Sequence, residues 1–115
     1  MTIIEILKLI EGEVVTQNSE MDIVVTHAFT SDLMSDVLTI KDQEGIALLT
    51  GLANVQTIRT VEMAGLNLVV LLRGKKANDD MIEIAEENDI VIIETKYSAF
   101  RVSAILYNAG IKSLF

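Results

Sequence analysis

The chain has 115 residues, with 17 acidic against nine basic side chains, a formal net charge of −8 and no cysteine. This length allows one small domain. The missing cysteines exclude disulfides, thiolate catalysis and cysteine-based zinc sites, and the acidic balance argues against binding to nucleic acid. Half of the residues are hydrophobic, a high share for a small domain, so we expect some apolar surface to be buried in a homodimer.

The first segment, TIIEILKLIEG, has the apolar spacing of a short helix over residues 2–11 that is closed by Gly12. It carries Glu5 and Lys8 and lacks a basic start and a small-residue cleavage site, unlike a signal peptide. No apolar run approaches the ~20 residues that span a bilayer. We therefore expect a cytoplasmic protein with no membrane segment.

Residues 13–112 form the expected core of a single domain over 1–115, in which short apolar runs alternate with segments of helical spacing. The predicted strands are Ile23 to Val25, Ile46 to Leu49, Leu68 to Leu72 and Ile90 to Ile93, and the predicted helices are Leu33 to Leu38, Val55 to Ala64, Met81 to Glu87 and Ala99 to Ala109. Serial strand–helix units predict an α/β fold with a mostly parallel sheet and helices on both faces. The continuously apolar runs LVVLL and IVII fit strands that are covered on both faces.

Polar junctions follow the four predicted strands, at Thr26 to Asp32, Thr50 to Asn54, Arg73 to Asp79 and Thr95 to Ser98. Right-handed connections bring the carboxyl ends of parallel strands to one edge, where such sheets bind ligands. The candidate ligand-binding residues at this edge are Ser31, Thr50, Gly51, Asn54, Arg73, Gly74 and Lys75. Backbone amides near Thr50, Gly51 and Asn54 would bind an anion, the basic Arg73–Lys76 cluster would add charge, and Ser31 a hydroxyl.

These residues also have structural interpretations. Ser31, Asp32, Asn54, Asn78 and Ser98 stand where helix N-caps belong, and Gly51 and Gly74 could be turn glycines. The Arg73–Lys76 cluster could be a solvated loop. His27 has no companion histidine at metal spacing, which favours packing or hydrogen bonding over ligation or acid–base work.

Motifs of common phosphate-handling and hydrolytic enzymes are absent from the sequence, which contains no GxxxxGK[ST], GxGxxG or GxSxG. Asp32 and Asp36 would share a helix face but supply too few ligands for a metal site. We therefore expect no catalytic residue, metal or cofactor. In a small phosphate-handling enzyme, the candidate base would be His27 or Asp32, beside Thr26 and Thr50.

Four blocks of the sequence, in their order, resemble the DRTGG domain family: SDLMSDVL (31–38), LLTGLANVQTIRTVEMAGL (48–66), LLRGKKANDDMIEIAEEND (71–89) and the closing LYNAGI. The resemblance covers roughly residues 13–112. Of the TGG part of the family motif, this sequence has only Thr50 and Gly51, and Leu52 replaces the final glycine. The chain is therefore most similar to the LTGL branch of the family, whose members occur beside CBS domains or alone. The resemblance implies an α/β module similar to those in CBS-containing pyrophosphatases and to the N-terminal domain of HPr kinase/phosphorylase, where it accompanies a catalytic domain.

The leading hypothesis is a non-catalytic regulatory domain that forms a homodimer and acts with a partner enzyme or a CBS-domain protein. It would sense a nucleotide or another phosphorylated metabolite at the carboxyl edge of the sheet. The alternatives are a small phosphate-handling enzyme and a purely structural interaction subunit. Phe100, Ala104 and Tyr107 recur at helical spacing in the closing helix, and the aromatic residues Tyr97, Phe100 and Tyr107 are expected to contribute to the dimer interface.

Overall fold

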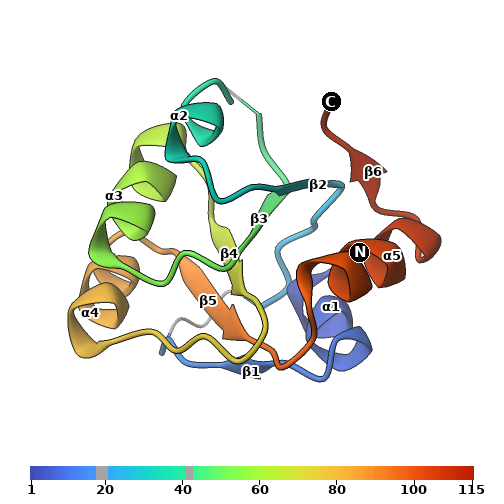
Figure 1. Cartoon of the computed structure of the whole chain (residues 1–115), viewed down its shortest axis with the longest axis horizontal. Helices are drawn as coiled ribbons and strands as arrows, with labels where there is room; N and C mark the ends of the chain where they lie inside the picture. Colours follow the sequence, from blue (N-terminus) through green and yellow to red (C-terminus); the bar gives the residue numbers. More distant parts are fainter. Residues whose placement is uncertain (18–20, 41–42) are drawn as a thin grey trace.

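A six-stranded sheet forms the middle layer of the fold, with helices on both of its faces (Figure 1). The computed structural model describes residues 1–17, 21–40 and 43–115, and no predicted helix or strand falls outside these ranges. The strands are β1 (Glu13–Val14), β2 (His27–Thr30), β3 (Ile46–Thr50), β4 (Leu68–Leu71), β5 (Val91–Glu94) and β6 (Lys112–Ser113). The helices are α1 (Ile3–Leu9), α2 (Met34–Val37), α3 (Val55–Ala64), α4 (Asp79–Glu87) and α5 (Ala99–Asn108).

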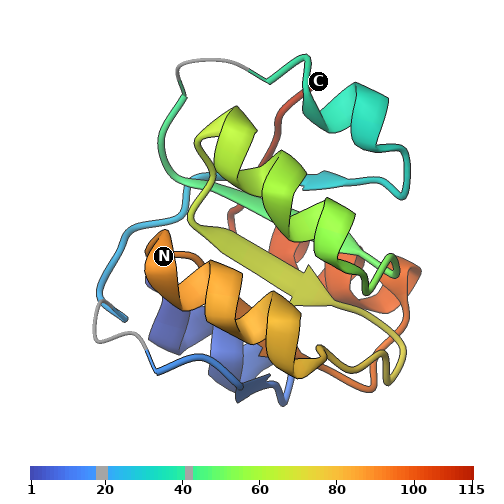
Figure 2. The same ribbon diagram turned by 90° about the vertical axis from the view of Figure 1, so that its left-hand side faces the viewer.

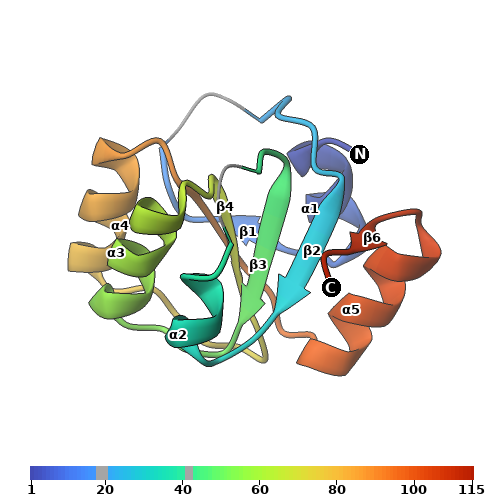
Figure 3. The ribbon, with the colours of Figure 1, turned by 90° about the horizontal axis from the view of Figure 1, so that it is seen from above.

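The strand order across the sheet is β1-β5-β4-β3-β2-β6, and all neighbours are parallel except β1, which runs antiparallel to β5. The helices α2, α3 and α4 cover one face, and α1 and α5 cover the other (Figure 3). The green α3 and the orange α4 lie side by side over the sheet (Figure 2). The predicted α/β fold is therefore confirmed. None of the described helices is both long and apolar enough to cross a membrane.

Alternate residues of the central strands contribute to two separate cores. Leu48 and Ile92 face the layer that contains α3 and α4, whereas Leu49 and Ile93 face α1 and α5. Every residue of β3, β4 and β5 is buried. Because both faces are covered, these strands read as unbroken apolar runs in the sequence, and each fully buried aliphatic side chain contributes about 1.5–3 kcal/mol.

Side-chain caps begin the three long helices. Asn54 accepts a hydrogen bond from the Thr57 amide at 2.9 Å, and Asn78 and Ser98 do the same for α4 and α5. The predicted capping role of these three residues is confirmed. Such a cap contributes about 1 kcal/mol to stability, because it satisfies an amide that the helix leaves unpaired.

The end of α1 differs from the prediction that Gly12 closes it. Glu11 is the residue in the left-handed region, with φ 48°. Gly12 is required for a different reason, since a Cβ built there would lie 2.6 Å from Cγ2 of Ile93. The close approach of the chain to β5, and not the helix end, selects glycine at this position.

The first predicted strand is wrong in position, because β2 comprises His27–Thr30 and not Ile23 to Val25. The segment around Val25 bonds to the start of the chain instead: the Val25 amide donates to the Met1 carbonyl, and the Ile3 amide donates to the Ile23 carbonyl. β2 is only half-buried, since its outer neighbour β6 pairs with just two of its residues. It therefore lacks the apolar run that marks β3 to β5.

Candidate functional site

A pocket of about 430 Å³ lies at the carboxyl edge of the sheet, where the chain leaves β2, β3 and β4 and where α5 begins. We call it the edge pocket; it is lined by Thr30, Ser31, Asp32, Gly51, Leu72, Arg73, Lys75 and Ala99. Four of the seven candidate ligand-binding residues, Ser31, Gly51, Arg73 and Lys75, thus meet around one cavity. Thr50, Asn54 and Gly74 do not line it.

The connections around this edge diverge. After β4 the chain continues into α4 on one face of the sheet, whereas after β5 it continues into α5 on the opposite face (Figure 3). Open α/β sheets bind ligands outside the carboxyl ends of their strands at such a divergence, because the connections separate and leave a crevice. The edge pocket lies at this carboxyl edge, beside the ends of β2, β3 and β4 and the start of α5.

Asp32 connects two strand ends at the pocket. Its Oδ1 accepts hydrogen bonds from Thr50 Oγ1 and from the Gly51 amide, both at 2.8 Å. Thr50 is fully buried, and its Oγ1 in turn accepts from the Leu52 amide at 3.1 Å. Thr50 thus fixes the position of the Asp32 side chain without lining the pocket. The Gly51 amide is already bonded to Asp32, so it is not free to bind a ligand anion.

The two predicted N-caps before α2 have other roles. The N-cap of α2 is Leu33, which makes no side-chain capping bond. Ser31 Oγ accepts from the Leu33 amide at 3.0 Å, which shapes the turn between β2 and α2. The capping interpretation of Ser31 and Asp32 is therefore wrong, although both residues line the edge pocket.

In the turn that follows β4, the backbone amides of residues 73–75 already donate hydrogen bonds within the chain, so a ligand would meet only the charged side chains. Arg73 and Gly74 both have positive φ, 53° and 75°, and the Lys75 amide donates to the Leu72 carbonyl at 3.1 Å. Two consecutive left-handed residues are typical of a type I′ turn, which accounts for Gly74. The Arg73 amide donates to the Tyr97 carbonyl. An anion at this turn would therefore be bound by the Arg73 and Lys75 side chains.

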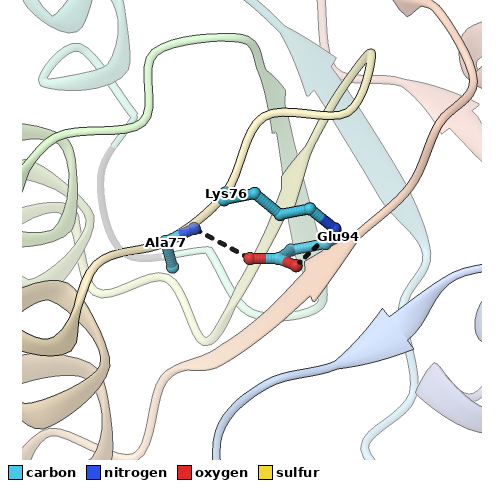
Figure 4. A network of polar contacts seen from close by, with 3 residues as sticks. All are labelled: Lys76, Ala77 and Glu94. Atoms are coloured by element: carbon cyan, nitrogen blue, oxygen red, sulfur yellow. Dashed lines mark hydrogen bonds and ion pairs between the residues drawn. The ribbon is translucent and has the colours of Figure 1, made fainter.

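The rest of this junction is held by Glu94, whose side chain is almost buried at 8% exposure. Its Oε2 accepts from the Ala77 amide at 2.8 Å, and its Oε1 lies 3.3 Å from Nζ of Lys76 (Figure 4). Within the described residues, this is the one ion pair. Arg73 and Lys75 are exposed and have no carboxylate partner there, so their charge is available at the pocket.

Thr26 and His27 lie at the opposite edge of the sheet. His27 begins β2 and pairs with Ile46, at the amino end of β3, while its Nδ1 hydrogen-bonds to Thr26 Oγ1 at 2.8 Å. The hydrogen-bonding role favoured for His27 is confirmed, and its expected position beside Thr50 is wrong because β2 starts later than predicted. In the described part of the chain, no three histidine or carboxylate side chains form a metal-binding group.

The helix α5 exposes the two aromatic side chains that the sequence predicts at a dimer interface. Phe100 is 85% exposed and Tyr107 is 70% exposed, while the buried face of α5 is formed by Val102 and Leu106. Tyr97 has intramolecular partners: its hydroxyl donates to the Glu11 carboxylate, and the Arg101 guanidinium lies 3.7 Å from its ring centroid. Phe100 and Tyr107 remain available for an interface, and their pairing with a second copy stays a prediction.

Comparisons with known proteins identify a similar fold. No protein-family model and no curated protein matches the sequence. One similar crystal structure comprises the CBS and DRTGG domains of the regulatory region of Clostridium perfringens pyrophosphatase, complexed with the activator diadenosine tetraphosphate. The TM-score is 0.76 at 19% sequence identity, over 91% of this chain and 45% of that one. The chain therefore spans less than half of that protein, and the similarity supports a DRTGG-like fold.

Proposed function

We propose that the chain is a non-catalytic regulatory domain that binds a nucleotide or another phosphorylated metabolite in the edge pocket. The observation that carries this proposal is the meeting of Ser31, Arg73 and Lys75 at one cavity, with both cations lacking a carboxylate partner among the described residues. The volume of about 430 Å³ lies within the range of about 300–1,000 Å³ that is typical of small-molecule sites.

The similar structure supports a regulatory role. It belongs to the regulatory region of an enzyme and was solved with a nucleotide activator. We extend this to the present chain as a proposal: ligand binding at the edge pocket would alter its contact with a partner enzyme or a CBS-domain protein. Any such effect requires the ligand to bind one state of the complex more tightly than the other.

Calorimetric titration tests the ligand-binding part. AMP, ATP, diadenosine tetraphosphate, acetyl phosphate and inorganic phosphate would each be added to the purified protein. Replacing Arg73 or Lys75 by alanine should weaken binding of the phosphorylated ligand by about tenfold or more, because each removes a charge-assisted hydrogen bond. Arg59→Ala is the matched control, since Arg59 is exposed on α3 and does not line the edge pocket.

Other outcomes would favour the alternative functions. Absence of binding across the whole panel, with folded protein, would contradict the ligand-binding part and favour a structural interaction subunit. Turnover of ATP or acetyl phosphate that Asp32→Asn abolishes would favour a phosphate-handling enzyme, because Asp32 is the candidate base that lies beside Thr50.

The homodimer is a separate part of the proposal. It is supported by the exposure of Phe100 and Tyr107 on α5, since large aromatic side chains are enriched in interface cores. Sedimentation velocity should show a dimer at micromolar concentration, and the double replacement by serine should produce a monomer. A wild-type protein that sediments as a monomer would contradict this part and leave the ligand-binding part unaffected.

A further inference from the structure

The exposed Asp32 carboxylate lines the edge pocket, and its two oxygens differ in their bonds to the described residues. Oδ1 accepts both the Thr50 hydroxyl and the Gly51 amide. No described residue donates a hydrogen bond to Oδ2. An aspartate carboxylate only accepts hydrogen bonds, so a ligand that satisfies Oδ2 has to bring a donor.

The pocket thus combines two chemically different ends. Arg73 and Lys75 supply positive charge for an anionic group, whereas Asp32 supplies a negatively charged acceptor. A bare phosphate would satisfy the cations and gain nothing from the carboxylate, whose like charge opposes it. A ligand with a phosphate at one end and hydroxyl donors at the other would satisfy both groups.

We infer that Asp32 makes the edge pocket selective for a ribose phosphate, either free or as part of a nucleotide. Arg73 and Lys75 hold the phosphate, and a ribose hydroxyl donates to Oδ2 of Asp32. Dinucleotide-binding α/β sheets use the same chemistry, with an acidic side chain on the ribose hydroxyls and the phosphates at a helix start. This inference rests on the proposed ligand-binding function and adds the class of ligand.

The carboxylate is held in place before any ligand arrives. Its two hydrogen bonds from the β3 end fix the side chain, which reduces the ordering cost that binding would otherwise carry. Gly51 does not have positive φ, so the backbone itself does not require glycine. A Cβ built at Gly51 would lie 3.8 Å from both Asp32 oxygens, an ordinary van der Waals contact, so the space beside the carboxylate does not require glycine either.

The test compares four probes by calorimetry: AMP, 2′,3′-dideoxyadenosine monophosphate, ribose 5-phosphate and inorganic phosphate. AMP should bind at least about tenfold more tightly than its dideoxy analogue, because a hydrogen bond to a charged acceptor is lost in the analogue. Equal binding of AMP and ribose 5-phosphate would support a free sugar phosphate as the ligand. Weaker binding of ribose 5-phosphate would support a nucleotide.

One variant and its matched control isolate Asp32. Asp32→Asn keeps an oxygen that can accept from Thr50 and Gly51 but replaces the charged acceptor at Oδ2 by a neutral NH₂. Since this NH₂ can still donate to a hydroxyl oxygen, the preference for AMP over the dideoxy analogue should fall several-fold without vanishing. Asp36→Asn is the matched control and should retain the full preference, since Asp36 is exposed on α2 and does not line the pocket.

The two proposals fail in different ways. Equal affinity of the wild-type protein for AMP and the dideoxy analogue would overturn the ribose inference and leave the phosphate-binding function standing. An undiminished preference in Asp32→Asn would also overturn it, because the hydroxyls would then be bound elsewhere. Absence of binding for all four probes would overturn both proposals together.

Discussion

Asp32 and Thr50 are joined by a side-chain hydrogen bond of 2.8 Å that ties the end of β2 to the end of β3. Thr50→Val keeps the shape of this fully buried side chain but removes the donor to Asp32 and the acceptor for the Leu52 amide. We expect a loss of about 1–3 kcal/mol in the free energy of unfolding. Urea denaturation measures it, and a loss below about 0.5 kcal/mol would contradict this assignment.

Thr60→Val should have the opposite effect. Thr60 is fully buried in α3, and among the described residues its Oγ1 has no hydrogen-bond partner. Valine has the same branching at Cβ, so the substitution mainly removes an unsatisfied hydroxyl. We expect a gain of about 1 kcal/mol by the same denaturation measurement. A loss as large as that of Thr50→Val would show that the Thr60 hydroxyl has a partner.

Asn54→Ala separates capping from ligand binding. The Asn54 side chain accepts from the Thr57 amide and lies outside the edge pocket. The variant should lose about 1 kcal/mol of stability, and Asn54→Ser should restore most of it. Affinity for AMP should not change in either variant. A clear loss of affinity in a variant that is fully folded would assign Asn54 to the binding site.

Glu94→Gln tests which contact of this nearly buried side chain matters. Its hydrogen bond to the Ala77 amide is short at 2.8 Å, whereas its ion-pair partner Lys76 is 69% exposed. We expect the glutamine variant to lose about 1–2 kcal/mol and the Ala77 amide to exchange faster with solvent. Lys76→Ala should lose less than about 0.5 kcal/mol, because exposed ion pairs contribute little. Equal losses in both variants would refute this ranking.

Tyr97 should titrate abnormally at high pH. Its hydrogen bond to the Glu11 carboxylate, with burial as a smaller cause, raises the pKa of the Tyr97 hydroxyl above its ordinary value. Because the folded state holds this proton more tightly, the contribution to stability is complete below about pH 10 and is lost as the pH rises through the raised value. Ultraviolet titration should show the pKa falling in Glu11→Gln, and an unchanged pKa would exclude this cause.

The central strands and three helix starts could be predicted from the sequence because their signals are local. Runs such as IVII are buried on both faces, and Asn54, Asn78 and Ser98 act within one helical turn. β2 could not be predicted, since HAFT is half-buried and has no distinctive pattern. β1 and β6 are two residues long and offer no periodicity.

The edge pocket could be predicted only in part, for a similar reason. The junction residues after each strand identify the correct edge, which places Arg73 and Lys75 at the pocket. The role of Asp32 depends on β2 lying beside β3, since its partner Thr50 is 18 positions away in the chain. No local pattern marks such a contact, and Asp32 therefore resembled a helix cap or a catalytic base.

The short strands at the two margins of the sheet affect how the molecule resists aggregation. β1 and β6 are short, so each offers only a few unpaired backbone groups. A strand of another chain could therefore form few hydrogen bonds with either margin of the sheet. Exposed charged residues, Glu13 in β1 and Lys112 in β6, oppose such pairing further. These two features of the margins protect the sheet from amyloid-like growth.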